Sequence, residues 1–120
     1  MQPTVKLKRA YAAPTKSDGR RILVDRMWPR GVTKGELRID DWVRDAAPST
    51  RLRKWFGHEP ARWVEFKRRY FHELDRQSDA IQPILERSRS GTVTLVFAAK
   101  DAEHNNAVAL KEYLEHRAGP

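Results

Sequence analysis

Residues 92–98 constrain the fold of this chain more than any other segment. The run reads Thr-Val-Thr-Leu-Val-Phe-Ala, and β-branched and aromatic residues of this kind favour a β-strand. Because its apolar residues are nearly continuous, both faces of the strand are expected to be covered. Residues 21–25, Arg-Ile-Leu-Val-Asp, have the same character. Two buried strands that each lead to a helical region predict an α/β fold with a small, mostly parallel sheet layered with helices.

Between these two strands, residues 40–91 have a helical pattern. Ser49 is a favourable N-cap for a short helix, and Gly57 is placed to end it in the left-handed conformation. Pro60 suits the first turn of a second helix, and a third helix accommodates Pro83 in its first turns. Four apolar residues of the second helix share one face: Trp63, Phe66, Tyr70 and Leu74.

The remaining elements lie at the two ends of the chain. Residues 5–8 alternate apolar and charged side chains, which predicts a half-buried or edge strand. The third helix covers about residues 79–90, and a last helix with Asp101 as its N-cap runs to about Glu115. The inward residues of these two helices are Ile81, Ile84, Leu85, Ala107, Leu110 and Leu114.

The chain has 120 residues and is 39% hydrophobic, which suits one core, so residues 1–120 are predicted to form a single domain. It contains no cysteine, which excludes disulfide bonds, thiolate zinc sites and a cysteine nucleophile. Its apolar runs are too short to span a bilayer, and the N-terminus lacks an apolar signal segment. We therefore expect a cytoplasmic protein with no membrane partner.

The net charge is strongly positive, with 24 Lys and Arg against 16 Asp and Glu, or +8. Basic residues recur along the whole chain rather than in a tail, so they belong to folded elements. They either solvate the surface or attract an anionic partner. A small anionic ligand and nucleic acid compete as that partner.

The first candidate binding segment is the loop of residues 25–31, at the carboxyl end of the first buried strand. Asp25, Arg26 and Arg30 combine a carboxylate with two guanidinium groups, which suit phosphate or carboxylate through forked hydrogen bonds. The alternative is that Asp25 pairs with one of these arginines while Trp28 fills the core. Ligands of parallel sheets bind beyond the carboxyl ends of the strands, which favours the binding interpretation.

The second candidate segment, residues 98–106, follows the other buried strand. Free N–H groups at the start of the next helix would bind an anion, and Lys100 would add a full charge. Asp101 is expected mainly to cap that helix. His104 and Asn105 are expected in its first turn, facing the same edge of the sheet. His104 is a candidate acid/base near neutral pH, and a structural histidine is the alternative.

His58 lies on a tight turn between helices and is expected at the rim of this region. No spacing of His58, His104, Asp25 and Asp101 supports a metal site, so no metal is predicted, and no cofactor is indicated. Three tryptophans are predicted to anchor the core rather than to stack on bases: Trp42, Trp55 and Trp63.

Three blocks in order make the chain similar to a known family: DRMWPRG at residues 25–31, LRKWFGH at residues 52–58 and AAKDAEHN at residues 98–105. The chain resembles the YeaO-like branch of the domain of unknown function 488 family, from Val5 to Leu114. The resemblance implies little chemistry, since the family is named for its lack of a known function. Some relatives in the wider family carry cysteines in the third block, so their thiol or redox chemistry does not transfer.

Together these patterns predict a polar, cationic cleft that binds or processes a small anionic ligand such as a nucleotide, a sugar phosphate or a carboxylate. The alternatives are a basic nucleic-acid-binding module without catalysis and a non-catalytic scaffold or partner-binding protein. If the chain is an enzyme, acid/base or hydrolytic chemistry is expected, with His104 or Asp25 carrying the proton. The predicted ligand-binding residues are Arg26, Arg30, His58, Lys100, Asp101 and Asn105. The oligomeric state is left open.

Overall fold

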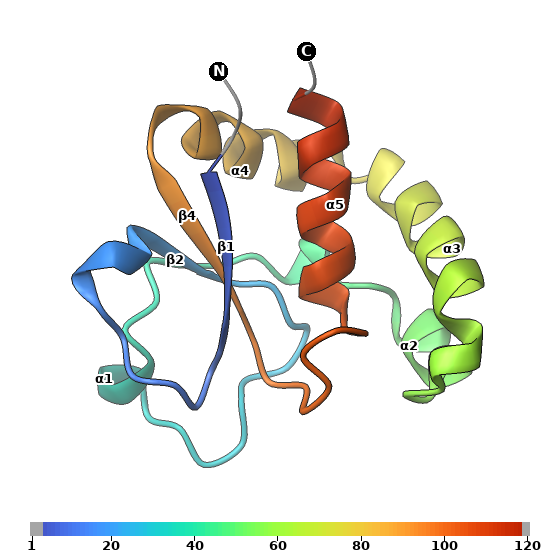
Figure 1. Ribbon diagram of the computed structural model, residues 1–120, viewed down its shortest axis with the longest axis horizontal. Coiled ribbons are helices and arrows are strands. Elements are labelled where there is room, and N and C mark those ends of the chain that lie inside the picture. The colour runs from blue at the N-terminus through green and yellow to red at the C-terminus, as the bar shows by residue number, and fades with distance from the viewer. Residues whose placement is uncertain (1–3, 119–120) are drawn as a thin grey trace.

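Four parallel strands form the sheet in the computed structural model, which describes residues 4–118. In space they follow the order β1 (Thr4–Arg9), β4 (Thr92–Phe97), β2 (Arg20–Leu23) and β3 (Asp41–Trp42). The apolar strand β4 thus lies between β1 and β2, as its continuous apolar run requires (Figure 1). The predicted α/β fold with a parallel sheet is confirmed, and β1 is an edge strand.

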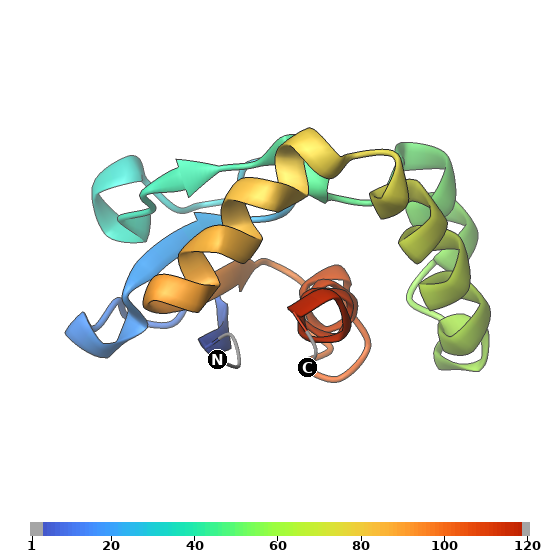
Figure 2. The same cartoon turned by 90° about the horizontal axis from the view of Figure 1, so that it is seen from above.

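Within residues 4–118, five α-helices connect and cover these strands. They are α1 (Lys34–Leu37), α2 (Thr50–Phe56), α3 (Trp63–Asp75), α4 (Ser78–Ser90) and α5 (Asn106–Ala118). Short 3-10 turns occur at Lys16–Asp18, Arg44–Ala46 and Pro60–Arg62. Helices α2 and α3 lie side by side at one end of the molecule, with α5 between α3 and the sheet (Figure 2).

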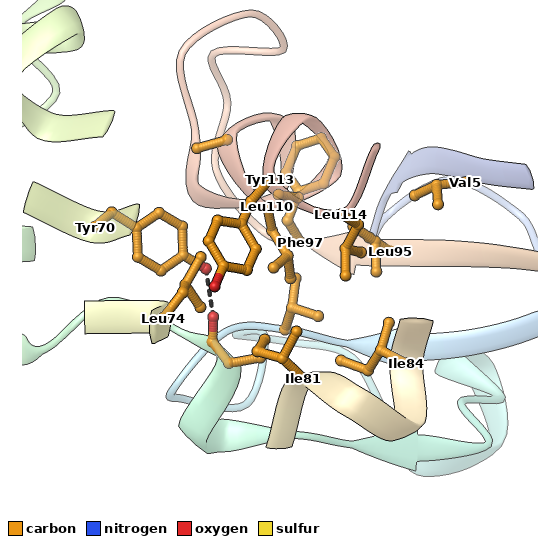
Figure 3. Packing of buried hydrophobic residues seen from close by; sticks show 14 of the residues in the cluster. Val5, Tyr70, Leu74, Ile81, Ile84, Leu95, Phe97, Leu110, Tyr113 and Leu114 are labelled. Atoms are coloured by element: carbon orange, nitrogen blue, oxygen red, sulfur yellow. Dashed lines mark hydrogen bonds between the residues drawn. The ribbon is translucent and has the colours of Figure 1, made fainter. Parts of the chain in front are cut away.

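The main core lies on one face of the sheet. Val5 is in register with Val93, and Ile22 with Leu95, so these four buried side chains point to the same face. Helices α4 and α5 cover that face, and Figure 3 shows their side chains meeting those of the strands. The buried residues of the two helices include Ile81, Ile84, Leu85, Leu110, Tyr113 and Leu114. Burying each large side chain contributes roughly 1.5–3 kcal/mol, so this cluster is the main source of stability.

Helices α2 and α3 follow the predicted caps and spacing. The Ser49 hydroxyl accepts a hydrogen bond from the Leu52 N–H (3.1 Å), and Gly57 ends α2 with φ 54°. The face predicted for α3 is buried at Phe66, Tyr70 and Leu74, with Trp63 partly buried. The Tyr70 hydroxyl donates to the Ala46 carbonyl, which ties α3 to the segment before α2 (Figure 3).

A smaller cluster covers the opposite face of the sheet. Leu23 and Val96 are fully buried there against Leu37 of α1. Trp28 and Trp42 pack beside them edge to face, with ring centres 5.5 Å apart. Both tryptophans are half-buried. They cover the face of the sheet on which residues 4–118 place no long helix.

Residues 40–49 do not form the predicted helix. This segment contains β3 and a 3-10 turn, because its backbone pairs with β2 instead of with itself. The Asp40 N–H donates to the Arg21 carbonyl (2.8 Å) and the Val43 N–H to the Leu23 carbonyl (2.9 Å). Strand β3 therefore corrects the sequence-based prediction that residues 40–49 are helical.

Candidate functional site

The segments that follow β2 and β4 meet at the carboxyl edge of the sheet, here defined as residues 25–31 and 98–105 with the start of α5. One Asp25 carboxylate oxygen accepts a hydrogen bond from the Ala98 N–H (2.8 Å), and the other accepts from the Asn106 side chain (3.1 Å). The same Asn106 amide nitrogen donates to the Val24 carbonyl (2.9 Å). Asp25 and Asn106 thus join the end of β2, the end of β4 and the first turn of α5.

The environment of Asp25 is unfavourable for charge. Burial raises the pKa of this carboxyl above its ordinary value, although the Ala98 and Asn106 donors and the charge of Arg53 on α2 act in the opposite direction. Asp25 forms an ion pair with neither Arg26 nor Arg30, so the pairing considered from the sequence does not occur. Both carboxylate oxygens instead serve as structural acceptors.

The two loop arginines have different environments. The Arg26 guanidinium donates to the carbonyls of Pro48 (3.3 Å) and Ala47 (3.2 Å), which holds it against the segment before α2. Arg30 is exposed, and its carbonyl accepts from the Tyr11 hydroxyl (3.0 Å) after β1. Neither guanidinium therefore pairs with Asp25 in the described residues.

In the connection from β4 to α5, the side chains of the segment accept hydrogen bonds from nearby backbone N–H groups. One Asp101 oxygen accepts from the N–H groups of Glu103 (2.9 Å) and His104 (3.0 Å). Asn105 accepts from the Val108 N–H (2.9 Å) and is therefore the cap of α5. Asp101 is not the helix cap, and His104 and Asn105 precede the helix rather than lie in its first turn. The predicted set of free N–H groups is thus partly occupied, because these short polar side chains bond local backbone donors.

His104 is held between two partners. Its Nδ1 lies 3.0 Å from the second carboxylate oxygen of Asp101, and its ring meets the Trp63 indole edge to face, with ring centres 5.4 Å apart. Donors from Glu103 and His104 lower the pKa of Asp101, so its ionised carboxylate favours a proton on Nδ1. That tautomer leaves Nε2 of the half-exposed imidazole as an acceptor.

The other predicted residues remain exposed. Lys100 has no ion pair or side-chain hydrogen bond within residues 4–118. His58 adopts φ 59° after Gly57 and lies next to Phe56, with ring centres 6.4 Å apart. Within the described chain, no group of three or more His, Asp or Glu side chains is arranged to hold a metal ion. No helix in that part of the chain is long and apolar enough to cross a bilayer.

Sequence reasoning missed two residues that act at this edge, one within it and one on α2. Asn106 follows two residues singled out from the AAKDAEHN block, but an asparagine at a helix start does not by itself indicate which loop it binds. Arg53 lies within the LRKWFGH block and is exposed on α2, yet its charge acts on Asp25. Only the folded structure, which brings Arg53 near Asp25, reveals that relation.

Comparison with known proteins identifies the family. A family profile described as "Inactive DUF488-N3 subclade" matches residues 4–119. The chain belongs to this DUF488 subclade. It is 36% identical over 110 residues to the uncharacterised protein YeaO of Escherichia coli K12, which covers 92% of this chain and 96% of YeaO. The resemblance to the YeaO-like branch is thereby confirmed.

A second relative of this DUF488 protein comes from Mycobacterium tuberculosis H37Rv. It is an uncharacterised protein, 37% identical over 113 residues, and the match covers 94% of this chain and 95% of the relative. No solved structure shows significant similarity to the chain.

Proposed function

We propose that this DUF488 protein binds a small anionic ligand, carrying a phosphate or carboxylate group, at the carboxyl edge without transforming it. The observation that supports this proposal is the contrast between the acidic and basic groups of the edge. Asp25 and Asp101 already accept two or more hydrogen bonds each, whereas Arg53 and Lys100 are exposed and form no ion pair within residues 4–118.

Charge favours an anion at this edge. Arg53 and Lys100 are exposed cations that would attract the negative charge of a ligand, and the charge of Arg53 also acts on Asp25. Arginine binds phosphate or carboxylate through a two-pronged contact, and lysine contributes a point charge. With Nδ1 of His104 bonded to Asp101, its Nε2 accepts a hydrogen bond from a hydroxyl group of the ligand rather than from its anionic oxygens.

Binding without catalysis agrees with the chemistry present. His104 and Asp101 resemble the base and orienting carboxylate of a catalytic pair, but no serine, threonine or cysteine forms a hydrogen bond with His104 in the described residues. Asp25 is committed to Ala98 and Asn106 and so serves as a structural acceptor. We therefore assign His104 a contact with the ligand.

A ligand panel followed by thermal shift tests this proposal. The probes are inorganic phosphate, adenosine monophosphate, a pentose phosphate and succinate. A ligand that binds only the folded chain raises its stability by about 2.7 kcal/mol at 100 times its dissociation constant. We expect at least one phosphate-bearing probe to stabilise the protein. The R53Q/K100Q double variant should weaken that binding by roughly tenfold or more, since hydrogen bonds to charged groups contribute about 1.5–3 kcal/mol.

The matched control is R51Q on the same helix. Arg51 is also exposed and precedes Arg53 by two positions, which places it on a different side of α2. R51Q should leave phosphate affinity unchanged. Equal losses in R51Q and R53Q/K100Q would show a diffuse charge effect and contradict a site at the carboxyl edge.

Nucleic acid is the competing ligand, because basic side chains are concentrated in the region of helices α2 and α3. Residues 50–76 hold eight Lys and Arg against four Asp and Glu, although Glu65 already pairs with Arg68 and Arg69 (both 2.7 Å). A protein that neutralises several phosphates loses affinity steeply as salt rises, whereas a single small ligand responds weakly. Tight, steeply salt-dependent binding of generic DNA or RNA, with no response to the small probes, would favour the nucleic-acid function.

A further inference from the structure

A cavity of about 250 Å³ lies between the end of α3 and the segment that leads into α2. Its apolar lining includes Leu74 and Ala47, both buried. Its charged lining consists of Arg26, Asp45, Glu73 and Arg76. Two guanidinium groups and two carboxylates thus surround one small space, which shares only Arg26 with the carboxyl edge.

One charge of each sign is held rigidly in the wall. Two nitrogens of the Arg26 guanidinium donate to backbone carbonyls, so the group is oriented while its third nitrogen keeps both N–H bonds without a partner in residues 4–118. The two Glu73 oxygens accept from the Ser49 N–H (2.8 Å) and the Ser49 hydroxyl (2.6 Å). Neither side chain needs to reorganise to receive a ligand, which lowers the entropic cost of binding.

The other two charged side chains of the lining are less constrained. Asp45 and Arg76 are exposed, and neither forms an ion pair or a side-chain hydrogen bond in the described part of the chain. The formal charges of the lining therefore cancel. A simple anion would meet Glu73 and Asp45, and a simple cation would meet Arg26 and Arg76, so each would gain attraction from one pair and repulsion from the other.

We propose that this cavity binds a zwitterion of the α-amino acid class. The ligand carboxylate lies against Arg26 and Arg76, and its ammonium group lies against Glu73 and Asp45. The volume is below the roughly 300–1,000 Å³ of sites for drug-sized molecules, which suits a free amino acid. Leu74 and Ala47 supply apolar contact for its side chain. This inference is independent of the proposed anion site.

Backbone amide NMR titration with free α-amino acids provides the test. A saturable shift of amides in residues 45–49 and 73–77 is expected for at least one amino acid, and acetate or methylamine alone should give none. R76Q and D45N should each weaken the binding by roughly tenfold or more. Both positions are exposed, so the variants are expected to fold.

The control is R89Q, which changes an exposed arginine on α4 that does not line the cavity. It should leave amino acid binding intact. The proposal is overturned if no amino acid gives saturable shifts in these segments, if acetate binds as well as the amino acids, or if R76Q and D45N bind like R89Q. Phosphate binding at the carboxyl edge is measured separately in the same variants. It should persist in R76Q and D45N.

Discussion

Replacing Asp18 by alanine is expected to lower the free energy of unfolding by about 3–5 kcal/mol, because a buried ion pair that loses one partner leaves an uncompensated charge. Asp18 is 3% exposed and contacts Lys8 (2.8 Å) and Arg21 (2.7 Å). Arg21 is 4% exposed and also donates to the Leu37 carbonyl (2.7 Å) at the end of α1. Urea denaturation of D18A and wild type measures the difference.

The pKa of the Asp18 carboxyl determines how the effect of D18A on the free energy of unfolding depends on pH. Burial alone would raise the pKa of Asp18, but hydrogen bonds from Lys8, Thr15 and Arg21 together lower it well below its ordinary value of 3.8. A lowered pKa in the folded state contributes stability that is present above about pH 4 and is lost as pH falls further. D18A should therefore differ from wild type more at neutral pH than at pH 3.

E115A is the matched control for D18A, since Glu115 is an exposed carboxylate near the end of α5. Its substitution should change the free energy of unfolding by about 0.5 kcal/mol or less. An equally small effect in D18A would show that the ion cluster contributes no stability, and the present account of this face of the sheet would be wrong.

The sequence predicted those elements whose pattern is local. Continuous apolar residues indicated β4, and the spacing of Phe66, Tyr70 and Leu74 indicated the inner face of α3. Helix α1 was missed although the Thr33 hydroxyl and the Glu36 carboxylate cap it reciprocally (3.1 and 2.9 Å). Its single turn carries too few residues for a helical period to appear.

Elements that depend on distant partners were not predictable in the same way. Residues 41–42 form a strand only because β2 supplies the neighbouring backbone, and two residues hold no periodic pattern. The start of α5 was misplaced because Asp101 and Asn105 are both good capping residues. Asn105 takes that role and is buried, while Asp101 stabilises the preceding turn and orients His104. The sequence predicted that residues 25–31 and 98–106 would lie on one edge of the sheet if their strands were parallel neighbours, but it did not predict the hydrogen bonds between them.

Asp25 provides the second large effect, with a pH dependence opposite to that of Asp18. We expect D25A to lower the free energy of unfolding by about 2–3 kcal/mol near pH 3, because a half-buried Ala98 N–H loses its acceptor and the Asn106 amide loses one of two. A raised pKa in the folded state contributes stability that is present below the ordinary value of 3.8 and is lost as pH rises through the raised value. The cost of D25A should therefore be smaller at pH 7 than at pH 3.

Variants at Asn106 and Asp25 together measure the energy of the contact between these two side chains. N106A keeps the Ala98 hydrogen bond to Asp25 but removes the donor to both Asp25 and the Val24 carbonyl, so its cost should be comparable to that of D25A. The loss of unfolding free energy in the D25A/N106A double variant should differ from the sum of the two single losses by about 0.5 kcal/mol or more, as expected for residues in direct contact. Additive costs, or a D25A cost that grows between pH 3 and pH 7, would contradict the structural role of Asp25. Because that role occupies both carboxylate oxygens, the same result would reopen Asp25 as a proton carrier at the carboxyl edge.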